Sequence, residues 1–181
     1  MEAIKVLIVE DEIIVARHIE DTLLSLGYAV TGIVSSGEEA IRLSGESPRP
    51  DVVLMDIMLE GEIDGIEAAG RIRKNYSIPI IFLTAFSNEK TLHRAKTAKP
   101  YGYILKPFQE TDFFTSIEIA IHKHRIERKL VEETENALAA IIGSAEVFLE
   151  EGADKHDSET LRRIEAIRHA AMIIKDTIEE L

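Results

Sequence analysis

Mainly apolar runs alternate along the chain with segments whose apolar residues recur every three or four positions. Five of the runs have the length of β-strands, and the segments between them have the spacing of amphipathic helices. Parallel neighbouring strands need crossover connections of this kind. The pattern therefore predicts an α/β fold in which helices cover both faces of a five-stranded parallel sheet. The predicted strands are residues 4–9, 28–34, 52–55, 79–84 and 101–105.

Carboxylates follow two of these strands. Glu10 and Asp11 come directly after the first, and Asp56 comes directly after the third. Because ligands bind beyond the carboxyl ends of parallel strands, we expect these side chains to share one crevice. Three carboxylates repel one another unless a cation lies among them, and oxygen ligands favour a hard ion such as magnesium. The backbone carbonyl of Met58 and several waters are the expected remaining ligands.

The other strand ends supply groups that could support phosphoryl transfer. A carboxylate such as Asp56 can act as a nucleophile toward phosphorus and form an acyl phosphate. Thr84 ends the fourth strand and Lys106 follows the fifth, so a hydroxyl and an ammonium group are available to neutralise the phosphoryl oxygens.

Each of these residues also has an ordinary structural explanation. A single Asp after a strand commonly shapes a turn, a Thr is favoured in strands because it is β-branched, and a Lys-Pro pair is common in loops. Taken singly, these explanations are favoured. The occurrence of all these residue types at four strand ends, in this order, favours a shared site.

Residues 1 to about 125 resemble a response regulator receiver domain of two-component signalling. The matching segments are LIVEDE, LMDIM, FLTAF and YILKPF, which contain the strand-end residues above. The resemblance implies a flavodoxin-like, doubly wound sheet of order 2-1-3-4-5, a magnesium ion, and phosphorylation of Asp56 by a sensor histidine kinase, followed by slow hydrolysis. It also implies catalytic roles for Thr84 and Lys106, a switch formed by Thr84 and Tyr103, and a cis peptide bond between Lys106 and Pro107.

Two features depart from the usual receiver sequence. The loop after Asp56, residues 59–65, lacks the usual proline. The positions two residues beyond Asp56 and Thr84 hold Met58 and Phe86, which are bulky and apolar. We expect both side chains to shield the acyl phosphate from water and to slow its hydrolysis.

The C-terminal third has the pattern of a helical hairpin. Residues 110–151 contain no proline and one glycine, so the last receiver helix is expected to continue as a long helix, followed by a turn at 150–157, a cap at Ser158 and a second helix. The predicted domains are a receiver at 1–125 and a hairpin at 126–181. Because two helices alone bury little apolar surface, we expect residues 130–181 to form a homodimer as a four-helix bundle.

The start of this hairpin resembles the dimerisation and histidine-phosphotransfer domain of sensor kinases. Glu132 stands where that family has its phosphorylated histidine, and no glycine-rich ATP-binding segment follows before Leu181, so histidine kinase activity is not expected. Glu133 and Asn136 resemble the motif of receiver phosphatases, although an ordinary charged helix face also explains them. The positions that match the kinase pattern are Asn136, Leu138, Ile141 and Gly143.

Charge and composition exclude several other classes. The net charge of -12 divides into -4 for residues 1–130 and -8 for residues 131–181, which argues against binding to nucleic acid phosphates. The basic cluster at 122–129 is best explained as a solvated helix face, and no helix-turn-helix pattern supports a DNA-binding regulator. The chain has no cysteine and no apolar run long enough to span a bilayer, so we expect a cytoplasmic protein that does not bind membranes.

The sequence therefore predicts a phosphorylation-dependent response regulator rather than an enzyme. Its receiver would control a dimeric helical arm and, through it, an unidentified downstream protein. The alternative is a phosphatase or phosphorelay component that acts on a partner receiver through the arm.

Overall fold

The computed structural model describes residues 3–85, 89–151 and 157–179. Its sheet has five parallel strands in the order β2-β1-β3-β4-β5, so the predicted flavodoxin-like order is confirmed. The elements are β1 (Lys5–Val9), α1 (Ile13–Ser25), β2 (Ala29–Val34), α2 (Gly37–Ser44), β3 (Val52–Asp56), α3 (Gly65–Tyr76), β4 (Ile80–Thr84), α4 (Glu89–Thr97), β5 (Gly102–Leu105), α5 (Glu110–Glu151) and α6 (Ser158–Glu179).

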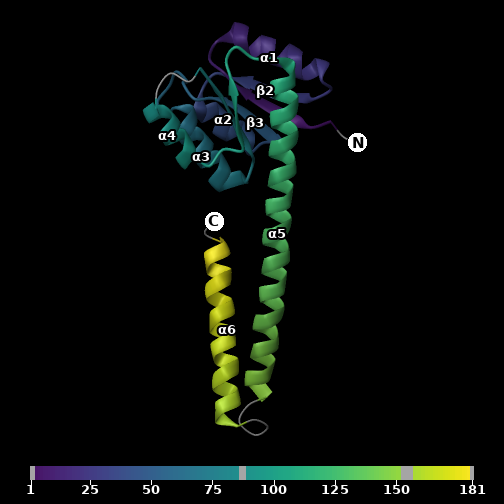
Figure 1. Cartoon of the computed structure of the whole chain (residues 1–181), viewed down its shortest axis with the longest axis vertical. Helices are drawn as coiled ribbons and strands as arrows, with labels where there is room; N and C mark the ends of the chain where they lie inside the picture. The colour runs from purple at the N-terminus through teal and green to yellow at the C-terminus, as the bar shows by residue number, and fades with distance from the viewer. Residues whose placement is uncertain (1–2, 86–88, 152–156, 180–181) are drawn as a thin grey trace. The chain divides into compact units, whose positions relative to one another are not determined.

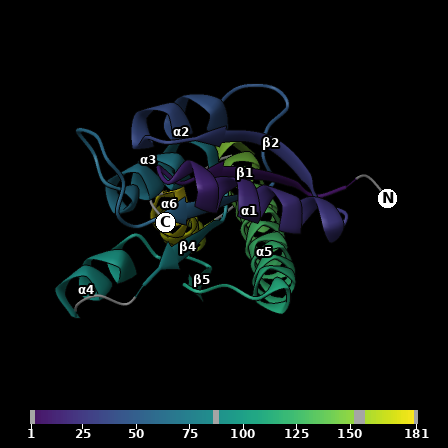
Figure 2. The ribbon, with the colours of Figure 1, turned by 90° about the horizontal axis from the view of Figure 1, so that it is seen from above.

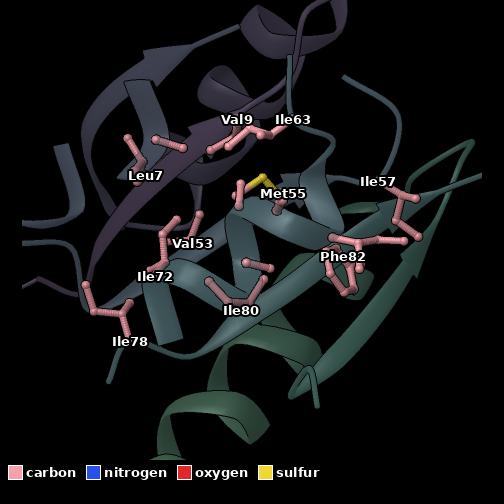
Figure 3. Packing of buried hydrophobic residues seen from close by; sticks show 14 of the residues in the cluster. Leu7, Val9, Val53, Met55, Ile57, Ile63, Ile72, Ile78, Ile80 and Phe82 are labelled. Atoms are coloured by element: carbon pink, nitrogen blue, oxygen red, sulfur yellow. The ribbon is translucent and has the colours of Figure 1, made fainter. Parts of the chain in front are cut away.

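Helices cover both faces of the sheet and create two hydrophobic cores. Helices α2 and α3 lie on one face, and α1 and the first part of α5 lie on the other (Figure 2). In the first core, Met55 and Phe82 of the sheet belong to one cluster with Ile72 of α3, and Figure 3 shows Ile72 near Val53 and Ile80. In the second core, Leu54 and Leu83 lie with Phe113 of α5. The central strands have no face in water, which explains why their apolar residues do not alternate with polar ones.

Strand register brings the polar strand ends to one edge. Met55 of β3 lies between Val9 of β1 and Phe82 of β4. Asp56 is the next and last residue of β3, and Glu10 directly follows β1, so both emerge at the same edge of the sheet. The register therefore positions the site that the sequence predicts.

Two helix caps test the local predictions. The Ser36 hydroxyl accepts a hydrogen bond from the Glu39 amide and so caps α2, as its sequence indicates. The predicted cap of α6 at Ser158 is wrong, because the Asp157 carboxylate accepts hydrogen bonds from the amides of Glu159 and Thr160 instead. A carboxylate also stabilises the positive end of the helix dipole. Asn88, the expected cap of α4, lies outside the described residues.

The chain divides into two compact units, residues 1–124 and 125–181. The boundary falls inside α5, which is continuous for 42 residues, as the absence of proline predicts. Within the second unit, α6 runs back alongside the end of α5 (Figure 1). The seam between these two helices buries Leu138, Ala145 and Ala171. Over the described part of the chain, no helix combines the length and the apolar character needed to cross a bilayer.

Candidate functional site

Three carboxylates from two strand ends form an acidic cluster at the edge of the sheet. Glu10 and Asp11 follow β1, and Asp56 is the last residue of β3. One oxygen from each side chain lies within 4.8 Å of the other two. Glu10 and Asp56 are buried, while Asp11 is half-buried. The structure thus brings together the three carboxylates that the sequence predicts as metal ligands.

Lys106 connects two members of this cluster. Its ammonium group donates hydrogen bonds to Asp56 Oδ2 at 2.5 Å and to Glu10 Oε2 at 2.8 Å. Burial opposes the positive charge, but the bonds to Asp56 and Glu10 outweigh it and raise the pKa of Lys106. The ammonium group therefore remains charged beside the carboxylate that is the predicted phosphoryl acceptor.

Glu10 is the member of the cluster with an unsatisfied oxygen. Its Oε1 atom is buried and has no hydrogen-bond partner among the described residues. Burial, with a smaller contribution from the negative charge of Asp56, raises the pKa of Glu10 to about 7, although the hydrogen bond from Lys106 lowers it. A buried carboxylate oxygen without a donor is costly unless a proton or a cation neutralises it. The donor set consists only of oxygens, so it fits a hard divalent cation such as magnesium.

The loop after Asp56 is tied back to the cluster by its own backbone. The Met58 amide donates a hydrogen bond to Asp56 Oδ1 at 2.9 Å, and the Glu60 amide donates one to Asp11 Oδ2 at 3.2 Å. The loop is thus held in place without the usual proline. The Met58 side chain is 66% exposed, so in this conformation it does not shield Asp56 from water. Phe86, the other expected shielding residue, lies outside the described residues.

The two residues of the expected switch lie on adjacent strands. Thr84 is the buried last residue of β4. Tyr103 is half-buried in β5, and its ring packs against Phe82 with 6.0 Å between the ring centroids. The Tyr103 hydroxyl is buried and makes no hydrogen bond to any described residue, and burial raises the pKa of Tyr103. The Lys106–Pro107 peptide bond is cis, as the resemblance implies.

The predicted residues of the arm belong to the second unit. Glu133 and Asn136 are both exposed on α5, one helical turn apart. Glu133 lies 3.6 Å from the Lys129 ammonium in an exposed ion pair. The acidic cluster of the first unit is therefore assembled without them.

Sequence reasoning missed a connection between the loop after Asp56 and α4. Asp64 Oδ1 accepts a hydrogen bond from the Glu67 amide and caps α3. Its other oxygen, Oδ2, accepts one from Arg94 of α4 at 2.6 Å. An aspartate before a helix is a recognisable capping signal. Its partner, 30 residues further along the chain, has no comparable signal.

Comparison with protein families identifies the first unit. The model of the response regulator receiver domain matches residues 6–118 of the chain. The chain belongs to the response regulator receiver family. This family works in two-component signalling, as the LIVEDE and YILKPF segments suggest.

Individual relatives agree with this assignment. The chain is 37% identical over 121 residues to the transcriptional regulatory protein PdtaR of Mycobacterium tuberculosis, which covers 67% of this chain and 58% of that protein. The signal receiver domain of a modulated diguanylate cyclase from Desulfovibrio desulfuricans is 44% identical, with a TM-score of 0.67, and the match covers 70% of this chain and 99% of that domain.

A third relative has a magnesium ion in its own active site cleft. The receiver domain of the sensor histidine kinase PA1611 from Pseudomonas aeruginosa, with magnesium coordinated in its active site cleft, is 34% identical with a TM-score of 0.60. The match covers 67% of this chain and 99% of that domain. The chain spans a little over half the length of the regulator PdtaR, and the match to that protein is confined to about two thirds of the chain.

Proposed function

We propose that this chain is a phosphorylation-dependent response regulator that accepts a phosphoryl group on Asp56 from a sensor histidine kinase. The observation that carries the proposal is the set of groups around Asp56, whose carboxylate accepts a hydrogen bond from the Lys106 ammonium and has an oxygen within 4.8 Å of oxygens of Glu10 and Asp11. A lone aspartate in a turn would not be surrounded in this way.

The chemistry follows from these neighbours. A carboxylate oxygen of Asp56 attacks the phosphorus, an acyl phosphate bond forms, and the bond from phosphorus to the donor's imidazole nitrogen breaks with its electron pair on the nitrogen. Lys106 is placed to neutralise a phosphoryl oxygen. Magnesium held by Glu10, Asp11 and Asp56, with the carbonyl of Met58, would neutralise the others when bound.

A direct test uses a small donor instead of a kinase. The full chain is incubated with acetyl phosphate, with and without magnesium, and its intact mass is measured. We expect the mass of one phosphoryl group to be added in the presence of magnesium and no addition to Asp56→Asn. Lys106→Gln should lower the rate by about 10². Asp51→Asn is the matched control, because Asp51 precedes β3 at the opposite end of the same strand. If wild-type protein with magnesium gains no phosphoryl group, the proposal is wrong.

The proposed switch depends on Thr84 and Tyr103. Phosphorylation adds nearly two negative charges and new acceptor oxygens at Asp56. Thr84 would then donate a hydrogen bond to the phosphoryl group, and Tyr103 would move further inward and repack the surface formed by α4, β5 and α5. A partner that prefers the repacked surface stabilises it, which couples phosphorylation to output.

We propose that the output passes through the helical arm, residues 126–181, acting as a homodimer through residues 130–181 on an unidentified downstream protein. The described part of the hairpin buries few large side chains, and many of its apolar residues are exposed. A hairpin of this kind gains most of its stability when a second hairpin covers that surface. Light scattering of the full chain at micromolar concentration tests this, and a monomer would contradict it.

A second candidate function is removal of phosphoryl groups from a receiver by the arm. The observation that favours it is the exposure of both Glu133 and Asn136 on α5. Both side chains are accessible to a docked receiver, and together they could orient a water molecule for attack on an acyl phosphate.

The lifetime of the acyl phosphate tests this second candidate. If Asn136 positions the attacking water, Asn136→Ala should lengthen the lifetime of phosphorylated protein at least tenfold, by loss of one oriented hydrogen bond. The control is Glu146→Ala, another exposed polar position on the same helix. Equal lifetimes for Asn136→Ala and wild type, for the chain itself and for a second receiver added to it, would exclude the arm as a phosphatase.

A further inference from the structure

Many large apolar side chains of the hairpin remain in contact with water, and five of them form one group. These five are between 44% and 63% exposed, and apolar side chains that are grouped on one surface indicate an interaction site. We call them the apolar face: Leu130, Ile141 and Phe148 of α5, and Ile167 and Ile174 of α6.

The two groups lie on the same side of the hairpin. In α5 the exposed Ile141 comes one residue before the partly buried Ile142, and in α6 the exposed Ile174 comes one residue before the partly buried Lys175. One residue is a rotation of about 100° around a helix. Because the two helices are antiparallel (Figure 1), the same rotation away from their shared seam turns both exposed lines toward one side.

The line on α5 has the spacing of a second packing seam. From Leu130 to Phe148 its positions recur at alternating intervals of four and three residues, which is the heptad pattern of helices that pack side by side. None of the six positions is charged, although residues 131–181 have a net charge of -8. The line consists of Leu130, Thr134, Ala137, Ile141, Ser144 and Phe148.

We propose that the apolar face is the site at which a second copy of this chain docks, so that two hairpins form a four-helix bundle. This inference rests on the dimeric arm of the proposed function and names the surface that forms the dimer. Two acidic arms repel each other, so an uncharged surface is where their approach is least opposed. A two-fold axis presents the same uncharged line from both copies, and such self-complementary interfaces are the commonest in homodimers.

The size of the surface clears the minimum of about 1,000 Å² that is expected for a specific interface. From Leu130 to Phe148, α5 rises about 27 Å, and two adjacent helices are about 20 Å wide. Each copy would therefore contribute a surface of about 550 Å², calculated as a flat rectangle. The total for two copies is about 1,100 Å², which is close to the lower limit for specific interfaces. Extension of the contact toward Ile126, which is also exposed, would enlarge it.

Two other apolar residues provide matched controls. Val147 of α5 is 56% exposed and Ile173 of α6 is 52% exposed. Each comes one residue before a member of the apolar face, so it is turned a further 100° away from the seam. In the proposed bundle both remain in water.

The test compares oligomeric state in the full chain. We expect wild type to be a dimer by light scattering at micromolar concentration. Ile141→Glu combined with Ile174→Glu should raise the dissociation constant at least 100-fold, whereas Val147→Glu combined with Ile173→Glu should change it less than threefold. Circular dichroism shows whether each variant keeps its helices. A monomeric wild type, or equal weakening by both pairs of substitutions, would overturn the proposal.

A second measurement locates the contact without adding charge. The chain has no cysteine, so one thiol can be placed at either position as Ile174→Cys or Ile173→Cys. At concentrations where the protein is dimeric, maleimide should react with the first at least tenfold more slowly than with the second, and dilution should remove the difference. Similar rates at all concentrations would contradict the proposed face.

Failure of this inference is distinguishable from failure of the proposed function. The double variant at Ile141 and Ile174 should still be phosphorylated by acetyl phosphate, because both substitutions lie in the second unit. A dimer that gains no phosphoryl group would leave the apolar face supported and the proposed chemistry wrong. A wild-type protein that is monomeric but phosphorylated normally would leave the proposed chemistry supported and the apolar face wrong.

Discussion

Gly65 lies against the backbone of Asp56 so closely that no side chain fits between them. A Cβ atom at Gly65 would come within 1.8 Å of the carbonyl oxygen of Asp56. The Gly65 amide also donates a hydrogen bond to the carbonyl of Ile57, the next residue. The first turn of α3 is therefore packed directly onto the strand end that carries the predicted phosphoryl acceptor.

We expect Gly65→Ala to damage both stability and the site. The methyl group must displace either α3 or the backbone of Asp56, at a cost of about 2–4 kcal/mol in the free energy of unfolding. The displacement should also lower the rate of phosphorylation by acetyl phosphate. Urea denaturation and intact mass measure the two effects.

Gly70→Ala is the matched control for this prediction. Gly70 lies in the same helix, and a Cβ atom there would meet nothing within 4 Å. Alanine is the better helix former, so this substitution should raise the free energy of unfolding by about 0.5–1 kcal/mol. Equal effects at the two glycines would show that the contact with Asp56 is not what requires glycine at position 65.

The strand ends of the site are predictable from sequence, whereas their surroundings are not. Strands buried on both faces must be continuously apolar, so a polar residue such as Asp56 marks the strand end by contrast. The buried, unpartnered oxygen of Glu10 has no such signal. Which of two adjacent acids is turned inward depends on the register and twist of β1, and these are set by residues distant in sequence.

The burial of Glu10 predicts a specific dependence of stability on pH in the absence of metal. The pKa of this carboxyl rises from the ordinary 4.5 to about 7 in the folded protein. Between these values the folded state binds a proton that the unfolded state has lost, so the contribution of Glu10 to stability falls as pH rises through this window. We expect the free energy of unfolding of Glu10→Gln to exceed that of wild type by about 2 kcal/mol at pH 8 and by little at pH 4.5.

Chemical denaturation in the presence of EDTA checks this prediction. Glu12→Gln is the control, since Glu12 is an exposed neighbour outside the cluster. The same pH dependence in Glu10→Gln and wild type would refute the explanation. Addition of magnesium at pH 8 should stabilise wild type more than Glu10→Gln, because an ion that binds the folded state stabilises it by mass action.

Asp64 has two separable roles, and a pair of substitutions can distinguish them. Asp64→Asn keeps a good helix cap but loses the ion pair with Arg94, so it should cost at most about 1 kcal/mol at this exposed site. Asp64→Ala loses both and should cost about 1 kcal/mol more. The free energy of unfolding in urea measures each cost.

A double-mutant cycle with Arg94→Gln isolates the ion pair. If the two charges interact in the folded protein, Arg94→Gln should be less destabilising in Asp64→Asn than in wild type. Additive costs would mean that the 2.6 Å contact contributes nothing to stability.

The hairpin illustrates a different limit of sequence analysis. The heptad-like spacing of its second helix groups Leu161, Ile164 and Ala171 with Ile167 and Ile174, but only the first three face inward to any extent. The exposed pair, Ile167 and Ile174, lies one residue before positions of α6 that are partly buried. Composition cannot separate a line that meets α5 from a line that is exposed in a single copy. The position of the α5 seam is needed to separate them.

The Tyr103 hydroxyl predicts an unusual result for a conservative substitution. This hydroxyl is buried without a hydrogen-bond partner among the described residues. Tyr103→Phe therefore removes a polar group that loses its hydrogen bonds to water on folding and forms none in their place. The free energy of unfolding should stay the same or rise by up to about 1 kcal/mol. Tyr103→Ala should lower it by about 3 kcal/mol, because the contact with Phe82 is lost and a cavity remains.

Tyr101→Phe makes the same chemical change where the hydroxyl has a partner. The Tyr101 hydroxyl is hydrogen-bonded to Nδ1 of His124 at 3.0 Å, so its removal should lower the free energy of unfolding by about 1 kcal/mol. If the two Tyr→Phe substitutions change the free energy of unfolding in opposite directions, burial of the Tyr103 ring leaves its hydroxyl without a hydrogen bond. A loss of similar size at Tyr103 would instead mean that its hydroxyl is satisfied in solution, and that an inward turn on phosphorylation would have to break that interaction.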